Sequence, residues 1–267
     1  MIVMPKVKVN DIQVYYEVKG EAFPLVMITG LSGNTDWWDP RVIQGLSKNF
    51  KIVMFDNRGA GRTDVTDREF TIRLFADDAA GLMDALRISR AHVLGISMGG
   101  MIAQELALNY PEKVEKLVLC STTCGGAKSI LPSQEVLNVL NADASGLSAE
   151  EVARMVVPLC FTKDFIDNNP DYVELMIRQI LKAPISDEAY RRQLNAIMQF
   201  DTYGRLSQIK APTLVLSGKR DVLNPSENGS ILAKAIPNAK LANFEKSAHL
   251  LTEDMEEVIH VITEFLV

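Results

Sequence analysis

The stretch Gly95-Ile96-Ser97-Met98-Gly99-Gly100 places one serine among three glycines. Residues 90–94 before it form a short apolar run that is typical of a buried strand. Residues 101–110 after it have the pattern of a helix, and Pro111 would end that helix. A strand that turns sharply into a helix projects the serine oxygen above the edge of a sheet. Glycines fit beside it because side chains would collide with the turn and the neighbouring strand.

A serine hydroxyl is a weak nucleophile that needs a base within hydrogen-bond reach and donors for the oxyanion that forms. The turn itself supplies one donor, because the amide of Met98 is the first of the helix and points at the same place as the Ser97 oxygen. We therefore expect Ser97 to be a catalytic nucleophile and the Met98 N–H to be part of an oxyanion hole.

The base must come from the three histidines of the chain. His260 faces away from the apolar stripe of the last helix, and His92 begins the strand that leads to Ser97, at the opposite end of the sheet. His249 follows a predicted last strand at 241–245, and the carboxyl end of that strand lies on the same edge as Ser97. His249 is the predicted base.

The third member of a triad would be a carboxylate that orients the imidazole. Asp221 directly follows the apolar run 213–217, and it gives the chain order Ser…Asp…His. A solvated turn aspartate is the alternative interpretation of this position. No Asp or Glu closely follows the strand predicted at 114–120, so the main rival position is empty.

Further apolar runs at 24–29 and 51–55 are typical of strands covered on both faces, and 71–88 carries a helical stripe. Residues 6–9 and 13–18 alternate as a hairpin does. Alternating strands and helices predict an α/β fold with a mostly parallel central sheet flanked by helices.

The alternation breaks between about residues 123 and 203, where helical patterns follow one another. A capping box at Ser148–Glu151 opens a helix to Cys160, and further helices are predicted at 170–181 and 186–200. We expect one core domain, residues 1–124 and 206–267, with an all-helical insertion at 125–205, which we call the cap.

These motifs resemble those of the α/β-hydrolase superfamily over essentially the whole chain. The Gly95-x-Ser97-x-Gly99 segment resembles its nucleophile elbow, and Thr29–Gly33 resembles its oxyanion loop. Residues 56–63 resemble its D-x-R-G-x-G-x-S segment, with Thr63 in place of Ser. The resemblance implies that the Leu31 N–H is the second oxyanion donor. Thr29 stands where relatives usually have His, which leaves open how the loop is supported.

Within the superfamily the sequence is similar to small carboxylesterases, 3-oxoadipate enol-lactonases and cofactor-free haloperoxidases or perhydrolases. The serine at position 97 argues against dehalogenases and epoxide hydrolases, which carry Asp there. Carbon–carbon bond hydrolases stay open. A non-catalytic ligand receptor is the rival class, but such proteins often lack triad members and this chain has all three candidates.

The predicted function is hydrolysis of carboxylic esters of small acyl compounds through an acyl-enzyme, with Ser97, His249 and Asp221 as the triad. Trp37 and Trp38 follow the oxyanion loop and either pack in the core or line the acyl pocket. Arg191 and Arg192 in the cap are exposed helix positions or, alternatively, receive a substrate carboxylate.

Composition limits the partners. The net charge of −6 and pI of about 5.2 argue against nucleic-acid binding. The N-terminus lacks a signal-peptide pattern and no run is long enough to span a bilayer, so we expect a cytoplasmic protein without a membrane partner. Three cysteines without C-x-x-C spacing indicate buried thiols and no metal site. We expect a monomer or homodimer without a cofactor.

Overall fold

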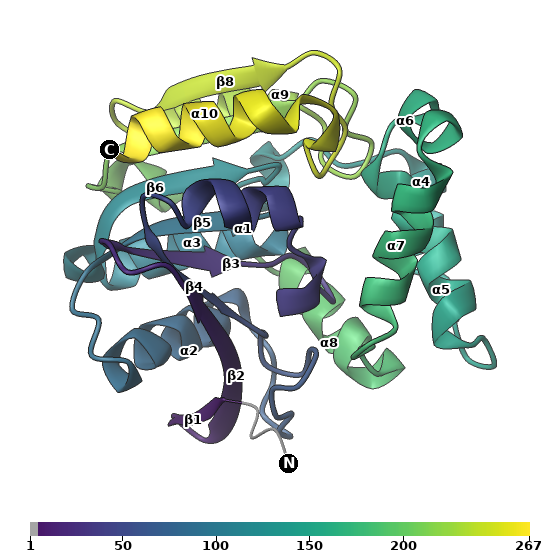
Figure 1. Cartoon of the computed structure of the whole chain (residues 1–267), viewed down its shortest axis with the longest axis horizontal. Helices are drawn as coiled ribbons and strands as arrows, with labels where there is room; N and C mark the ends of the chain where they lie inside the picture. Colours follow the sequence, from purple (N-terminus) through teal and green to yellow (C-terminus); the bar gives the residue numbers. More distant parts are fainter. Residues whose placement is uncertain (1–4) are drawn as a thin grey trace.

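A computed structural model describes residues 5–267 (Figure 1). Its centre is a sheet with strand order β1-β2-β4-β3-β5-β6-β7-β8. The strands are β1 (Lys6–Val9), β2 (Ile12–Lys19), β3 (Pro24–Ile28), β4 (Lys51–Phe55), β5 (Ala91–Ile96), β6 (Val114–Cys120), β7 (Thr213–Gly218) and β8 (Lys240–Phe244). The β1–β2 hairpin is antiparallel, β2 joins β4 in antiparallel fashion, and every other pair is parallel.

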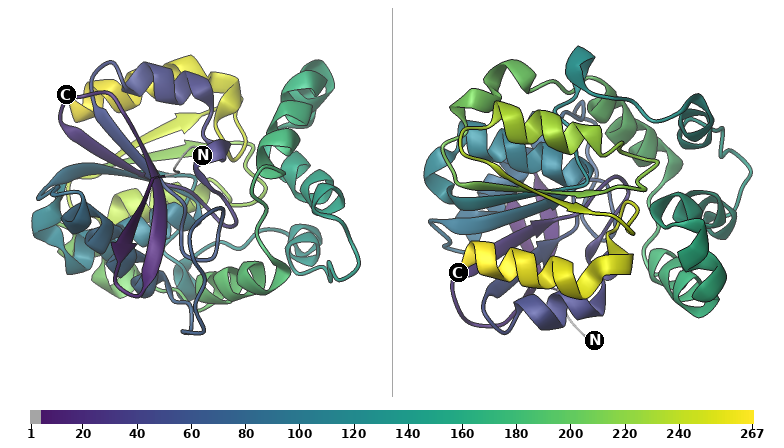
Figure 2. Two further views of the ribbon diagram at one scale, coloured as in Figure 1. Left: turned by 60° about the horizontal axis from the view of Figure 1, so that its bottom comes forward. Right: turned by 90° about the horizontal axis from the view of Figure 1, so that it is seen from above.

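Helices cover both faces of the sheet, as the alternation predicts (Figures 1 and 2). One face is covered by α2 (Ile72–Ala85), α3 (Met98–Asn109) and α9 (Glu227–Ala235), and the other by α1 (Pro40–Leu46) and α10 (Met255–Leu266). Successive residues of a strand point to opposite faces. Val26 and Ile28 accordingly pack in the first core, whereas Leu25 and Met27 pack in the second.

The segment between β6 and β7 contains the helices α4 (Gln134–Leu140), α5 (Ala149–Val156), α6 (Lys163–Asn168), α7 (Pro170–Ile180) and α8 (Asp187–Met198). They lie together at the side toward which the parallel strands point (Figure 1), and several share a core of their own that includes Ala153, Val173 and Ile177. The limits of the cap at 125 and 205 stay a prediction.

The predicted capping box is present at the start of α5, where Ser148 and Glu151 bond to each other's backbone. The helix was expected to reach Cys160, but α5 ends at Val156 and a 3₁₀ turn follows at Val157–Cys160. Pro158 accounts for the difference, because it has no N–H to continue the α-helical ladder. Other 3₁₀ turns are η1 (Thr35–Trp37), η2 (Pro111–Lys113), η3 (Gly126–Lys128), η5 (Tyr203–Gln208) and η6 (Thr252–Asp254).

Among residues 5–267, no helix has the length and apolarity needed to cross a bilayer.

Candidate active site

Ser97 is the single residue between β5 and α3. Its backbone has φ +56° and ψ −122°, a combination that L-residues rarely adopt and that is typical of strained functional positions. The Ser97 N–H donates to the Cys120 carbonyl at 2.9 Å, and the Thr122 hydroxyl donates to the Ser97 carbonyl at 2.7 Å. The backbone is therefore held from the β6 side while the side chain faces the cavity described below.

The two flanking glycines are required by close backbone contacts. A Cβ on Gly95 would lie 2.1 Å from the Gly99 carbonyl oxygen, and a Cβ on Gly99 would lie 2.1 Å from that of Ile28. Neither neighbour is a side chain that could move aside. The glycines thus let α3 begin directly against the end of β3, the strand that leads into the Thr29–Gly33 loop.

His249 and Asp221 meet beside this turn, from the loops that follow β8 and β7. His249 Nδ1 lies 2.8 Å from Asp221 Oδ2, and both side chains are buried. The other Asp221 oxygen accepts the N–H groups of Leu223 (2.9 Å) and Asn224 (2.8 Å), so the alternative of a solvated turn aspartate does not describe it. His249 shares a cavity with Ser97, and Asp221 stands behind the imidazole.

The other two histidines lie elsewhere. His92 is the second residue of β5, at the end of the strand away from Ser97, and packs against the rings of Phe23 and Phe50. His260 is exposed on α10 and its nearest carboxylate, Glu264, is 3.9 Å away. Their positions match the predictions made for them.

The loop after β3 borders the serine closely. A Cβ on Gly30 would lie 3.5 Å from Ser97 Oγ. The N–H groups of Leu31 and Met98 have no acceptor within residues 5–267, so both remain free for an oxyanion. The Leu31 and Met98 side chains carry no donor, so the predicted oxyanion role of these residues falls to their backbone amides and stays a prediction.

The structure also shows how Thr29 supports this loop in place of a histidine. The Thr29 hydroxyl donates to the Gly33 carbonyl at 3.0 Å, which closes the loop on itself. The Asn57 side chain donates to the Thr29 carbonyl at 3.1 Å. Asn57 was not identified from the sequence, although it lies in the segment 56–63 that resembles a family motif.

A second unpredicted contact comes from the cap. The Gln193 side chain, on α8, accepts the Ser32 N–H at 2.9 Å and donates to the Arg58 carbonyl at 3.1 Å. Nothing in the local sequence indicates a contact between positions 161 residues apart.

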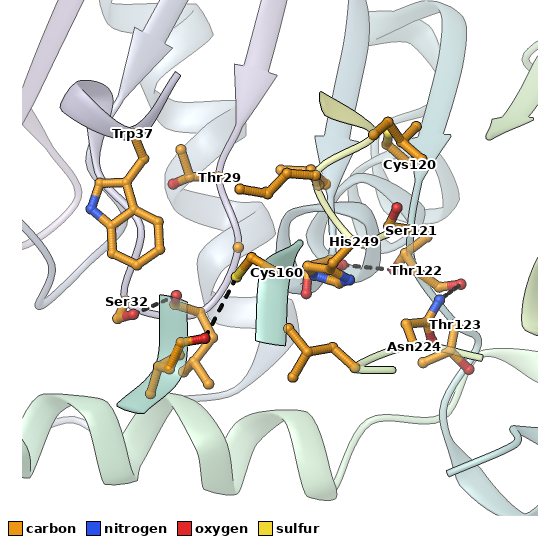
Figure 3. Close-up of a pocket in the computed structure, with 18 of the residues that line it drawn as sticks. Thr29, Ser32, Trp37, Cys120, Ser121, Thr122, Thr123, Cys160, Asn224 and His249 are labelled. Carbon is orange, nitrogen blue, oxygen red and sulfur yellow. Dashed lines mark hydrogen bonds between the residues drawn. The ribbon is translucent and has the colours of Figure 1, made fainter. Parts of the chain in front are cut away.

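Ser97, His249 and Leu31 line a cavity of about 230 Å³. Figure 3 shows His249 among other residues that line it. Both Trp37 and Trp38 line it, and each also packs against a hydrophobic core, so they combine the two predicted alternatives. Most of the lining is apolar. Burial raises the pKa of the Cys120 and Cys160 thiols to about 12, and the charge of Asp221 adds to the shift. Both thiols therefore stay protonated and are poor nucleophiles.

The cavity carries little charge. No lysine or arginine of residues 5–267 lines it. Neither Arg191 nor Arg192 lines the cavity. Arg191 pairs with Asp187 at 2.8 Å, and Arg192 stacks on Phe70. Among residues 5–267, Asp39 is the one carboxylate that lines the cavity. Its pKa is raised by burial but lowered more by hydrogen bonds from Arg41 and Tyr172, and it stays ionised.

In residues 5–267 there is no group of three or more His, Cys, Asp or Glu side chains arranged to hold a metal ion.

Comparison with known proteins gives consistent matches. The family model described as alpha/beta hydrolase fold matches residues 24–254. The chain is 28% identical to a putative carbamate hydrolase RutD of Azorhizobium caulinodans, over 96% of each chain. It is 32% identical to a 2-hydroxy-6-oxononadienedioate/2-hydroxy-6-oxononatrienedioate hydrolase of Burkholderia vietnamiensis, over 96% of this chain and 92% of the relative. The crystal structure of the enol-lactonase from Burkholderia xenovorans LB400 superposes with a TM-score of 0.87 at 28% identity, covering 98% of this chain and 99% of that one.

Proposed function

The chain belongs to the alpha/beta hydrolase fold family and is a hydrolase, and from that premise we propose that it cleaves carboxylic esters of uncharged acyl groups through Ser97. The observation that carries the proposal is the meeting of Ser97 and an Asp221-bound His249 at one cavity, with two free amides beside the serine. That set supplies the nucleophile, base and oxyanion donors that acyl transfer needs.

In the proposed reaction, Ser97 Oγ attacks the ester carbonyl carbon while His249 Nε2 takes the serine proton. The carbonyl oxygen becomes an oxyanion that accepts the N–H groups of Leu31 and Met98. Collapse of this intermediate breaks the bond to the alcohol, which leaves with the proton from His249. Water then attacks the acyl-enzyme by the same route and releases the acid. Asp221 keeps the imidazole in the tautomer whose Nε2 is free to accept.

The charge of the cavity supports an uncharged substrate. The names of the relatives from Burkholderia vietnamiensis and Acinetobacter baylyi, a dienedioate hydrolase and a 3-oxoadipate enol-lactonase, denote substrates that carry at least one free carboxylate. A carboxylate moved from water into an apolar cavity needs a cationic partner. Among residues 5–267 no lysine or arginine lines this cavity, and the carboxylate on its wall, Asp39, is already paired with Arg41. We therefore favour an uncharged ester over a lactone or carbon–carbon substrate that carries a free carboxylate.

The test combines turnover with covalent labelling. We expect short p-nitrophenyl esters to be hydrolysed, an enol-lactone with a free carboxylate to be a poor substrate, and a fluorophosphonate to label Ser97 alone. Ser97→Ala should lose about 10⁴-fold or more in kcat with an unchanged thermal transition. An active alanine variant, or labelling at another residue, contradicts the proposal. Absence of both turnover and labelling in the unaltered protein would favour a ligand receptor.

A further inference from the structure

A second cavity of about 200 Å³, lined mostly by cap residues, adjoins the first. Val152, Ala153 and Ala183 line it and do not line the active-site cavity. The two cavities share six lining residues, which are Ser32, Trp37, Leu140, Val156, Cys160 and Tyr190. These six residues form a common boundary, so an occupant of one cavity lies next to the other.

Most polar side-chain groups on the wall of the second cavity already have partners, but Trp37 Nε1 is buried without a hydrogen-bond partner among residues 5–267. The Tyr190 hydroxyl donates to the Leu140 carbonyl at 2.9 Å, and the Ser32 hydroxyl donates to the Leu31 carbonyl at 2.6 Å. The Asp187 carboxylate is half-exposed and pairs with Arg191. The remaining lining is almost entirely aliphatic, so the cavity favours a hydrocarbon group and disfavours a charged one.

We propose that this cavity binds the apolar end of the substrate's acyl group, an inference that rests on the proposed function. Figure 3 shows Trp37 and Ser32 on one side of His249, with Thr122 and Asn224 on the other. The proposed oxyanion donor Leu31 directly precedes Ser32, which lines the second cavity, so in this proposal the acyl group lies beside Trp37 and the leaving alcohol lies toward Thr122 and Asn224. An apolar cavity of roughly 150 Å³ accommodates a benzene ring, so this one accommodates a phenyl group or a short alkyl chain.

The experiment compares two ester series, one lengthened in the acyl group and one in the alcohol. For the unaltered protein we expect kcat/KM to rise about fourfold per acyl methylene until the cavity is filled. Val152→Phe should lower the ratio of long-acyl to acetyl kcat/KM at least tenfold, and Ala183→Leu should do so less strongly. Leu175→Phe, on the cap surface away from both cavities, should leave the ratio unchanged.

The assignment is overturned if Val152→Phe and Ala183→Leu fold and both still prefer long acyl groups. It is also overturned if these variants instead lose a preference for long alcohol groups. The proposed function is tested separately, because acetyl-ester turnover and Ser97 labelling do not depend on the second cavity.

An independent observation concerns Gln193, whose side chain is fully buried between the cap and the core. Both polar groups of its amide form hydrogen bonds: the oxygen accepts the Ser32 N–H, and the NH₂ group donates to the Arg58 carbonyl. Ser32 has φ +59°, which is unfavourable for a serine and needs support from its surroundings. Gln193 supplies that support from the cap.

We infer that Gln193 is a positioning residue for the oxyanion loop, given the role proposed for Leu31. The Ser32 N–H belongs to the peptide unit that directly follows Leu31, so fixing it restricts the rotation of Leu31 and the direction of its own N–H. The same side chain is anchored to the loop after β4 through Arg58. The cap is thereby tied to the geometry of the proposed oxyanion hole.

Gln193→Met keeps the length of the side chain and removes both hydrogen bonds. We expect kcat to fall about 10- to 100-fold, approaching the loss of one oxyanion donor, with KM within about threefold. The rate of phosphonylation by a fluorophosphonate should fall by the same factor, since that reaction develops an oxyanion in the same place. The matched control is Gln179→Met, because the Gln179 side-chain oxygen on α7 is buried without a partner in the described part of the chain.

Gln193→Glu keeps an acceptor for the Ser32 N–H but loses the donor to Arg58, so its kcat should lie between those of the unaltered protein and Gln193→Met. A folded Gln193→Met variant with the kcat of the control overturns the inference. If Gln193→Met does not fold, the inference is instead overturned by a Gln193→Glu variant whose kcat equals that of the unaltered protein. A protein in which Ser97 is not labelled would instead contradict the proposed function.

Discussion

The Nδ1 atom of His249 lies 2.8 Å from Oδ2 of Asp221, although the two residues belong to loops after different strands. The loops are packed against each other, because the Arg220 N–H donates to the Ser247 carbonyl at 3.0 Å. The remaining Asp221 oxygen is held by two backbone amides. The carboxylate therefore has a fixed orientation before any substrate arrives.

Asp221→Asn tests whether that orientation matters for the reaction. The asparagine oxygen can still accept the two amides, but its NH₂ group would face His249 Nδ1 and enforce the wrong imidazole tautomer. We expect kcat to fall about 10⁴-fold with little change in the thermal transition. Asp254→Asn is the control, since Asp254 bonds Ser247 in the same loop without touching His249. If Asp221→Asn keeps a tenth of the activity, another group orients the base.

His92 predicts a dependence of stability on pH that is separate from catalysis. Burial lowers the pKa of His92, the positive charge of Lys116 adds to this, and its buried Nδ1 has no partner among residues 5–267. Because the pKa is lower in the folded state than the roughly 6.5 of the unfolded chain, the fold favours the neutral form. This contribution to stability is complete above about pH 6.5 and is lost as the pH falls through the folded pKa.

Urea unfolding between pH 7.5 and 5 measures the effect. We expect the free energy of unfolding to fall over this range by about 1.4 kcal/mol for each unit by which the pKa of His92 is lower in the folded than in the unfolded protein. His92→Leu should flatten the profile, whereas His260→Leu should not, because His260 is exposed. Identical slopes for His92→Leu and the unaltered protein would show that other groups cause the acid sensitivity.

Thr29 provides a prediction about the support of the loop. Thr29→Val removes the hydroxyl that bonds the Gly33 carbonyl but keeps the shape of the side chain. The loss of one such bond is worth about 1 kcal/mol, so we expect kcat to fall about fivefold. Thr29→Ser restores the hydroxyl and should recover most of the rate on p-nitrophenyl acetate. Equal rates for the two variants would mean that Asn57 alone is sufficient.

The fold class was predictable because it depends on short-range patterns. Near-continuous apolar runs that alternate with helical stripes leave a mostly parallel sheet as the simple solution, and the prediction is confirmed. Ser97, Asp221 and His249 could be placed on one edge because each follows the carboxyl end of a strand. Their catalytic roles remain a prediction. Gln193 could not be found this way, since its contact with Ser32 depends on how the cap helices pack on the core.

Gly99→Ala examines why the second glycine of the Gly95-x-Ser97-x-Gly99 segment is needed. In an ordinary helix alanine is more favourable than glycine by about 1 kcal/mol. Here the new Cβ would lie 2.1 Å from the Ile28 carbonyl oxygen and 2.6 Å from that of Thr29, so α3 must move away from the end of β3. We expect the free energy of unfolding to fall by about 1–3 kcal/mol.

That movement would also separate the amides of Met98 and Leu31, so kcat should fall further than the loss of folded protein explains. Gly204→Ala is the matched control, because a Cβ there meets no atom within 4 Å, and its stability should change by less than about 0.5 kcal/mol. Urea unfolding and kcat on p-nitrophenyl acetate measure both effects. A Gly99→Ala variant that unfolds like the control would mean that α3 and β3 separate without cost. The close approach of helix and strand would then not be the reason for this glycine, and its place in the segment would need an explanation in the chemistry of the turn itself.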